Sequence, residues 1–288
     1  MVVTLENTNV TSRIFFGSCS SQYYEQPFWN IIKERNPTAF VWGGDAIYAD
    51  DQKREAWSDE DPAPWLPSIL KDRRRARKVA YATPEYIRKM YSKQLQVKDY
   101  QKLLQENIMA GEKISIFGAI DDHDYGINNG DVTFPYRRQS GIEFTKFLGL
   151  KNESSAMARR AAEGLGVYGV QVYDFSSTSR RLLTDDEAGL DPDVVPAQSF
   201  SHRSKDHDET SNQLVAVFVL DVRSNKTPWA KRIPERFTLQ KGDFLGEHQW
   251  EWFETAIGRS KASVNIIVSG IQVHAPWFYD ANIIENWR

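Results

Sequence analysis

Five short runs of apolar residues divide the chain, and each is continuous rather than alternating. Continuous runs are typical of strands that are buried on both faces of a sheet. The segments between the runs are long enough for helices, so the pattern predicts an α/β fold with a mostly buried sheet. A single domain over residues 1–288 is expected, because no internal repeat or linker divides the chain. The five runs are residues 13–21, 38–45, 113–122, 214–223 and 264–273.

Three of the intervening segments are expected to be helices. Residues 23–37 carry apolar side chains at helical spacing. A longer helix is expected to begin at Pro84 with Thr83 as its cap, and to run toward Asn107. Residues 245–258 have an amphipathic pattern and end in a glycine, which predicts a helix that stops there.

Two polar segments interrupt this alternation, and both are expected to be surface insertions. They lie near residues 49–78 and 180–212. The first ends in the basic run "KDRRRARK", which could contact an anion; a solvated helix face is favoured because no aromatic or glycine residue interrupts it. The net charge of -3 gives no basic field for a nucleic-acid scaffold role.

Hydropathy, cysteine content and the N-terminal sequence bear on the cellular location without deciding it. No apolar stretch approaches the roughly 18 residues needed to span a membrane. The single cysteine, Cys19, excludes an internal disulfide framework. The chain does not open with a basic segment followed by an apolar one, so a cytoplasmic location is the default expectation. Secretion stays open if a signal peptide precedes Met1 in a longer precursor, and the oligomeric state is not predicted.

Residues with metal-binding chemistry follow the predicted strands. In open α/β sheets a ligand site lies outside the carboxyl ends of the strands. Adjacent carboxylates repel and are costly to bury without a positive partner. Acids at several strand ends therefore predict a metal site at that edge. The residues are Cys19 near the end of the first run, Asp45 at the end of the second with Tyr48 just past it, Asp121 and Asp122 at the end of the third with His123 next, and Asp221 and Arg223 at the end of the fourth.

The same residue types also have structural interpretations. Cys19 alone is most often an inert buried residue, and Tyr48 a half-buried ring. Asp45 could cap a helix, and Asp221 could form an ion pair with Arg223.

The other histidines divide in the same way. His202, His207 and His248 lie in polar stretches and are expected on the surface. His274 follows an apolar run, and the sequence does not decide between the core and the site.

The motifs "GSC", "GGDAIY" and "DDHDYGINN" together resemble the PhoD-like family of metallophosphatases, the alkaline phosphatase D relatives. The segments "LDVRSNKTPW" and "LGEHQWEWFETAI" fit that family in the same order. The resemblance covers residues 13–50, 84–150 and 168–273. It implies two facing β-sheets flanked by helices, with a multinuclear metal site at the strand ends. It also implies hydrolysis of phosphate monoesters or diesters by metal-activated water, so the expected partner is a small phosphate-ester substrate.

The resemblance also implies metal ligands. Cys19 and Tyr48 would bind ferric iron, and Asp45 would bridge the metals. Asp122 would be a further ligand, whereas Asp121 is either a ligand or a neighbour of one. Hard oxygen ligands suit calcium, while thiolate and phenolate suit iron, so iron and calcium are the expected cofactors, with other divalent metals open.

Four residues receive roles toward the substrate. By the resemblance, His123 would face the phosphate and stabilise the developing charge or protonate the leaving alkoxide. Arg223 is a candidate phosphate clamp, since a guanidinium matches phosphate oxygens. Asn128 and Asn129 could bind phosphate or supply an oxygen ligand, or could form only a turn.

Members of that family continue past the region of "IIENWR" to a further strand and a "GDxH"-type motif, whereas this chain stops at Arg288. A C-terminal strand and one ligand set are therefore expected to be missing. Two functions follow as alternatives: a metal-dependent phosphoesterase, or a truncated non-catalytic remnant that binds metal or phosphate. Covalent catalysis by Cys19 is disfavoured because no C-x5-R phosphate loop follows it. A plain calcium-binding protein is disfavoured because no EF-hand spacing occurs.

Overall fold

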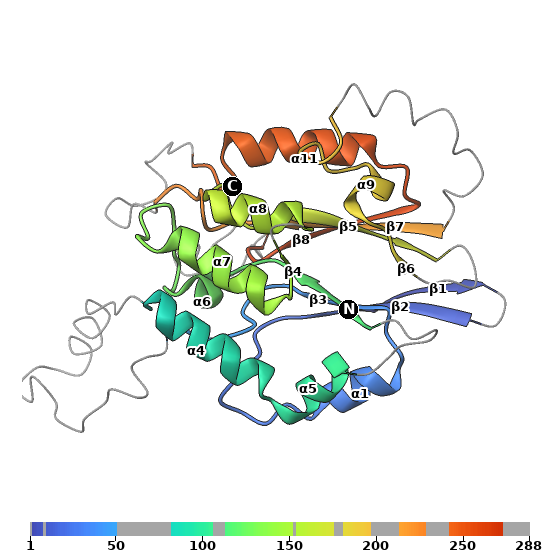
Figure 1. Cartoon of the computed structure of the whole chain (residues 1–288), viewed down its shortest axis with the longest axis horizontal. Coiled ribbons are helices and arrows are strands. Elements are labelled where there is room, and N and C mark those ends of the chain that lie inside the picture. The colour runs from blue at the N-terminus through green and yellow to red at the C-terminus, as the bar shows by residue number, and fades with distance from the viewer. Residues whose placement is uncertain are drawn as a thin grey trace, which may run out of the picture.

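In the residues that it describes, the computed structural model has two four-stranded sheets with helices around them (Figure 1). The mixed α/β composition predicted from the sequence is confirmed, and the division into two sheets agrees with the implication of the resemblance. The structure describes residues 2–7, 10–50, 82–105, 113–151, 154–175, 181–196, 213–228 and 242–272.

The first sheet carries three of the five predicted strands. Its order is β1-β2-β3-β4, with β1 antiparallel to β2 and the other neighbours parallel. All four residues of β3 are buried. Burial of such large apolar side chains contributes about 1.5–3 kcal/mol each. The strands are β1 (Val2–Asn7), β2 (Val10–Gly17), β3 (Ala39–Trp42) and β4 (Ser115–Gly118).

The second sheet carries the other two predicted strands. Its order is β6-β5-β7-β8, in which β5 and β7 are antiparallel and β7 and β8 are parallel. Residues along β7 alternate between two apolar clusters, so this strand is buried on both faces as predicted. The strands are β5 (Gly169–Asp174), β6 (Arg181–Leu182), β7 (Leu214–Leu220) and β8 (Val264–Ser269).

One apolar cluster joins the two sheets. It includes Val41 of β3 together with Val217 and Val219 of β7. Ser115 of β4 also donates a hydrogen bond to Gln171 of β5 at 3.1 Å. In Figure 1 the sheets lie one above the other, with α1, α4 and α5 along the first and α8, α9 and α11 along the second.

The helices have the following bounds: α1 (Phe28–Glu34), α4 (Pro84–Leu95), α5 (Lys98–Gln105), α6 (Asp122–Tyr125), α7 (Arg137–Phe147), α8 (Ala156–Glu163), α9 (Asp185–Ala188) and α11 (Glu247–Arg259). Thr83 caps α4 as predicted, because its side chain accepts a hydrogen bond from the Tyr86 N–H at 3.3 Å. None of the described helices is long and apolar enough to cross a membrane.

Several boundaries predicted from the sequence are wrong. The run at residues 264–273 is not buried on both faces, because β8 lies at the edge of the described part of its sheet and Ile267 is 50% exposed. The long helix divides after Leu95 into α4 and α5. Gly258 does not end α11, because its φ is not positive and the chain leaves the helix only at Ser260, with ψ of 128°.

Parts of the predictions fall on residues that the structure does not describe. These include most of the first expected insertion (49–78), residues 197–212 of the second, and His202, His207 and His274. The described part of the second insertion, residues 181–196, contains β6 and α9 rather than irregular chain alone.

Candidate metal centre

Backbone hydrogen bonds hold the turns after β2 and β3 together. The Cys19 N–H donates to the Gly44 carbonyl at 3.3 Å, and the Ser20 N–H donates to the Asp45 carbonyl at 3.0 Å. Cys19 and Asp45 have φ of 58° and 53°, a left-handed conformation that is costly for residues other than glycine. This arrangement brings the Cys19 Sγ within 3.6 Å of the Asp45 Oδ2.

The third strand end is a helical turn rather than the continuing strand predicted for residues 113–122. β4 ends at Gly118, Asp121 is the N-cap of α6, and Asp124 Oδ2 accepts a hydrogen bond from the Asp121 N–H at 3.2 Å. Acids are favourable in the first turn of a helix, where N–H groups are unpaired. Asp122 also accepts from the Asn129 N–H at 2.7 Å.

Three of the predicted site residues lie close enough to share one cation. One ligand atom from each of Asp45, Asp122 and His123 lies within 4.8 Å of the others. Both carboxylates are only 7% exposed, and the Asp45 Oδ1 is buried with no hydrogen-bond partner. A carboxylate oxygen in this state is costly unless a cation or donor satisfies it. The donor set therefore fits a metal ion.

The negative charges of the cluster oppose one another. Burial, followed by the charge of Asp121, raises the pKa of Asp45 to about 7. Burial and then the charge of Asp45 raise the pKa of Tyr48. Partial burial of the sulfur atom raises the pKa of the Cys19 thiol as well, and the charge of Asp45 adds to it. A bound cation would favour the ionised form of all three groups.

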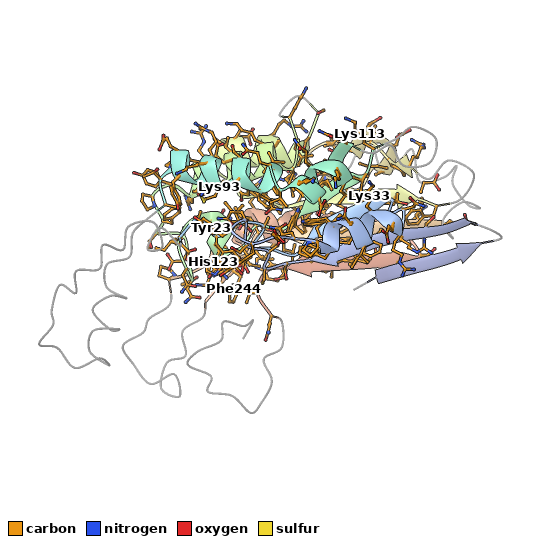
Figure 2. The ribbon with its side chains drawn as sticks, turned by 90° about the horizontal axis from the view of Figure 1, so that it is seen from below. Tyr23, Lys33, Lys93, Lys113, His123 and Phe244 are labelled. Carbon is orange, nitrogen blue, oxygen red and sulfur yellow. The ribbon has the colours of Figure 1, made fainter. Side chains whose placement is uncertain are left out.

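His123 has a carboxylate partner that the sequence analysis missed. The Asp50 Oδ1 lies 2.6 Å from the His123 Nδ1, and the Tyr48 ring lies 4.3 Å from the imidazole, centroid to centroid. Burial lowers the pKa of His123, but the hydrogen bond and charge of Asp50 outweigh it and raise the pKa to about 9. Figure 2 shows His123 toward the same end of the molecule as Tyr23. The available sequence signal for Asp50 was its position two residues after the end of "GGDAIY".

Arg223 lies against Asp121. Its Nε and Nη2 lie 2.7 and 2.6 Å from the Asp121 Oδ1, and its Nη2 lies 3.9 Å from the Asp122 Oδ2. Two glycines enclose this carboxylate: a Cβ added at Gly44 or at Gly270 would lie 2.6 Å from the Asp121 side chain. The ends of β4, β7 and β8 therefore meet at Asp121. A contact between Arg223 and a substrate phosphate stays a prediction.

Asp221 has a structural role instead of pairing with the Arg223 guanidinium. It is fully buried, and its carboxylate accepts hydrogen bonds from the backbone N–H groups of Val167, Arg223 and Ser224 at 2.7–2.9 Å. The Ser224 hydroxyl donates a fourth bond at 2.6 Å. These bonds fix the turn after β7 and so direct the Arg223 side chain toward Asp121.

The remaining predicted residues contribute less to the geometry. Asn128 is exposed, and Asn129 has φ of 56° in a turn whose N–H binds Asp122. Their contact with phosphate stays a prediction. Cys19 is exposed, so the interpretation as an inert buried residue is wrong, and the described residues that follow Asp45, 46–50, form no helix for it to cap. His248 is exposed as predicted, with its Nδ1 2.6 Å from the Tyr168 hydroxyl.

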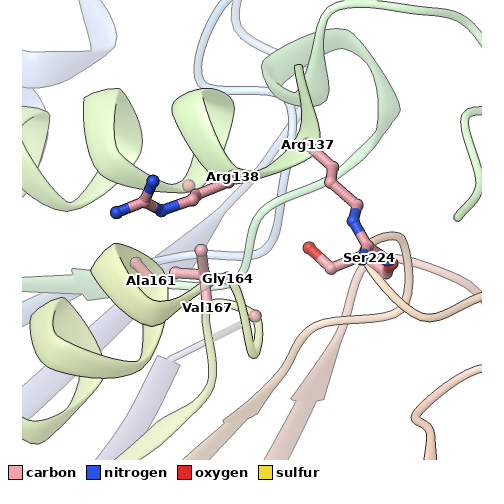
Figure 3. Close-up of a pocket in the computed structure, with 8 residues that line it drawn as sticks. Arg137, Arg138, Ala161, Gly164, Val167 and Ser224 are labelled. Atoms are coloured by element: carbon pink, nitrogen blue, oxygen red, sulfur yellow. The ribbon is translucent and has the colours of Figure 1, made fainter. Parts of the chain in front are cut away.

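A narrow hollow lies elsewhere, between α7, α8 and the turn after β7 (Figure 3). Arg137 and Arg138 line it, but their guanidinium groups donate to the carbonyls of Ser224 and Ala162 at 3.1 and 2.6 Å. No acid or histidine is among the described residues that line it. This hollow is therefore not part of the candidate metal centre.

No protein-family model and no curated protein sequence matches the chain. A solved structure described as "Structure of PhoD" is similar to it, with 14% sequence identity and a TM-score of 0.47. The similarity covers 89% of this chain and 43% of that chain, so this chain spans less than half the length of that protein.

Proposed function

We propose that the protein is a metal-dependent phosphoesterase that hydrolyses phosphate monoesters or diesters. The observation that supports this most is the Asp45–Asp122–His123 cluster with its buried, unpartnered Asp45 Oδ1. A cation is the simplest group that satisfies that oxygen and offsets the repulsion between neighbouring carboxylates. The motif resemblance adds the substrate class and the expectation of a metallophosphatase arrangement of the two sheets.

The ligand chemistry separates into two kinds. In this proposal, Cys19 and Tyr48 bind ferric iron, because thiolate and phenolate oxygen suit it, and Asp45 bridges to a second metal. Asp122 supplies a hard oxygen of the kind that calcium prefers. When bound, such metals neutralise phosphate oxygens and lower the pKa of water.

His123 has the surroundings of a proton donor. With Nδ1 held by Asp50 at 2.6 Å, the imidazole keeps Nε2 for the leaving group of a substrate. In the metal-free protein the hydrogen bond and charge of Asp50 raise the pKa of His123, which favours the protonated form that a general acid requires. The Tyr48 ring against the imidazole restricts its rotation. Arg223, Asn128 and Asn129 complete the proposal as donors toward phosphate.

The test is metal content and turnover of the purified protein. We expect iron with a visible tyrosinate-to-iron absorption, and calcium-dependent hydrolysis of an aryl phosphate monoester or diester. Asp45→Asn and Asp122→Asn should each lose metal and activity, whereas Asp186→Asn, an exposed acid in α9, should change neither.

The outcomes separate the alternatives. Retention of wild-type metal content by both site variants would show that the ligand assignment is wrong. A wild-type protein that binds metal but hydrolyses neither ester would favour the non-catalytic alternative.

A further inference from the structure

The loop between β3 and the undescribed segment carries Asp45, Tyr48 and Asp50, yet residues 43–50 form no helix or strand. Asp45 in this loop also has a left-handed φ of 53°. Such a conformation costs on the order of 1 kcal/mol and persists only where surrounding contacts impose it. The side chains that hold this loop therefore decide whether its ligands stay in place.

Gln22 holds the loop from one side. Its Oε1 accepts a hydrogen bond from the Tyr48 N–H at 2.9 Å, and its Nε2 donates to the Tyr48 carbonyl at 3.2 Å. The same Nε2 lies 3.2 Å from the Met90 Sδ of α4. The side chain is only 8% exposed. The Gln22 amide thus satisfies both the N–H and the carbonyl of Tyr48. Two hydrogen bonds to one loop residue fix the position of its backbone.

Asp124 holds the loop from the other side. Its Oδ1 accepts from the Ile47 N–H at 3.2 Å and from the Tyr91 hydroxyl at 3.3 Å, and its Oδ2 accepts from the Asp121 N–H. This carboxyl is fully buried. It therefore connects the loop after β3 to the start of α6. Neither Gln22 nor Asp124 is among the groups placed as metal ligands.

From these contacts we propose that Gln22 is a positioning residue of the metal centre. It acts through the backbone of Tyr48, and so sets the Tyr48 ring against His123 and keeps Asp45 in its left-handed turn. The inference rests on the proposed function, in which Asp45 and Tyr48 bind metal. Ligands that are held before the metal arrives lose less conformational entropy when they bind it.

The test compares Gln22→Met with Gln94→Met. Gln94 is a fully buried amide of α4 that forms reciprocal 2.9 Å hydrogen bonds with Gln26. Both variants lose the hydrogen bonds of a buried side-chain amide, but only Gln22→Met removes the two hydrogen bonds to the Tyr48 backbone. Calcium binding by calorimetry and the iron absorption band are the readouts, with urea unfolding of the metal-free proteins as the measure of stability.

Gln22→Met is expected to weaken calcium binding about 10–100-fold, as loss of a group that orients a ligand typically does. It should also shift the iron band, because the Tyr48 phenol moves. Gln94→Met should bind calcium within about twofold of wild type even if it is equally destabilised. Gln22→Asn keeps a buried amide that is too short to reach both Tyr48 groups. It should weaken binding in the same direction, and it serves if Gln22→Met does not fold.

Equal calcium affinity of wild type and Gln22→Asn or Gln22→Met would overturn the inference while leaving the proposed function intact. Equal losses in the Gln22 and Gln94 variants would also overturn it, since they would show a general effect of destabilisation. A wild-type protein that binds neither calcium nor iron would overturn the proposed function itself, and the positioning role with it.

Discussion

Asp45 carries two costs at once in the folded, metal-free protein. Its backbone is left-handed, and its Oδ1 is buried without a partner. Both features destabilise the folded state, and an apolar residue at this position would avoid the unpartnered buried oxygen. Costs of this kind are retained where a ligand offsets them. At this position the simplest such ligand is a cation.

The raised pKa of Asp45 predicts how stability depends on pH. The folded state binds a proton that the unfolded chain releases near pH 3.8, so the stability of the metal-free protein contributed by this group falls between pH 4 and 7. Relative to Asp45→Asn, the wild type should be about equally stable at pH 4 and less stable by up to about 4 kcal/mol at pH 7. Urea unfolding at several pH values, after chelation, measures the difference.

The contribution of His123 to stability also falls as the pH rises, but over a higher pH range. Its pKa is raised from 6.5 to about 9, so its contribution is complete below pH 6.5 and is lost as the pH approaches 9. The Asp45→Asn variant should therefore still lose stability above pH 6.5. A wild type that gains stability over the variant between pH 4 and 7 would contradict the burial argument for Asp45.

The Arg223–Asp121 pair predicts strong coupling between two residues from different sheets. Both side chains are buried, so removal of either leaves an uncompensated charge, which typically costs about 3–5 kcal/mol. Arg223→Met and Asp121→Asn should each be strongly destabilising, while the double variant should cost clearly less than their sum. A double-mutant cycle by urea unfolding measures this, and an additive result would contradict a direct pair.

Strand ends, rather than strand interiors, shape the centre. Gly270 follows β8, and a methyl group there would lie 2.6 Å from the Asp121 Cγ, although the backbone φ is not positive. Gly270→Ala should therefore destabilise the protein by about 1–3 kcal/mol through overpacking, and should weaken metal binding by displacing Asp121. Gly258→Ala is the matched control, because no atom lies within 4 Å of the added methyl.

The control variant Gly258→Ala should stabilise the protein rather than destabilise it. Gly258 lies inside α11, where alanine is favoured over glycine by about 0.5–1 kcal/mol. Thermal unfolding and calcium titration of both variants give the comparison. Equal stability of the two alanine variants would mean that the carboxyl end of β8 does not constrain Asp121.

Continuous apolar runs allowed five strands to be predicted, since burial on both faces leaves a pattern that short sequence windows contain. The strand β5 was missed, because its sequence GVQVYD mixes polar and apolar residues, and four of its six residues are buried only through contacts that the fold supplies. The split between α4 and α5 was missed as well, since helical spacing continues across Gln96. The Thr83 cap was predicted correctly, because one side chain carries that signal. The predicted helix end at Gly258 was wrong, because a glycine ends a helix in this way only when its φ is positive.

The residues of the candidate centre also fall into those that the sequence identified and those that it missed. Cys19, Asp45 and His123 were identified because their chemistry is unusual at strand ends. Gln22 was missed because a buried glutamine has no distinguishing sequence pattern, and its role exists only through contact with Tyr48, 26 positions away. Arg223 was identified, but its contact with Asp121 spans 102 positions and joins two sheets. No local pattern contains that information.

At the scale of the whole molecule, an apolar cluster and a buried ion pair are among the contacts that connect the two sheets. The apolar cluster contains side chains of β3 and β7, and the Arg223–Asp121 pair joins the carboxyl ends of β7 and β4. The three clustered side chains that could share a cation, Asp45, Asp122 and His123, all follow strands of the first sheet. Stabilisation by a bound metal should therefore reach the second sheet chiefly through that ion pair.

Hydrogen exchange with and without calcium tests this coupling. At calcium about 100 times its dissociation constant, the folded state gains about 2.7 kcal/mol, so exchange that requires global unfolding should slow about a hundredfold. In the wild type, β3 and β7 should slow together. In Arg223→Met, exchange in β7 should slow much less than in β3, because the second sheet can then open while the metal stays bound. Equal slowing of both strands in the variant would show that the shared apolar cluster alone carries the coupling.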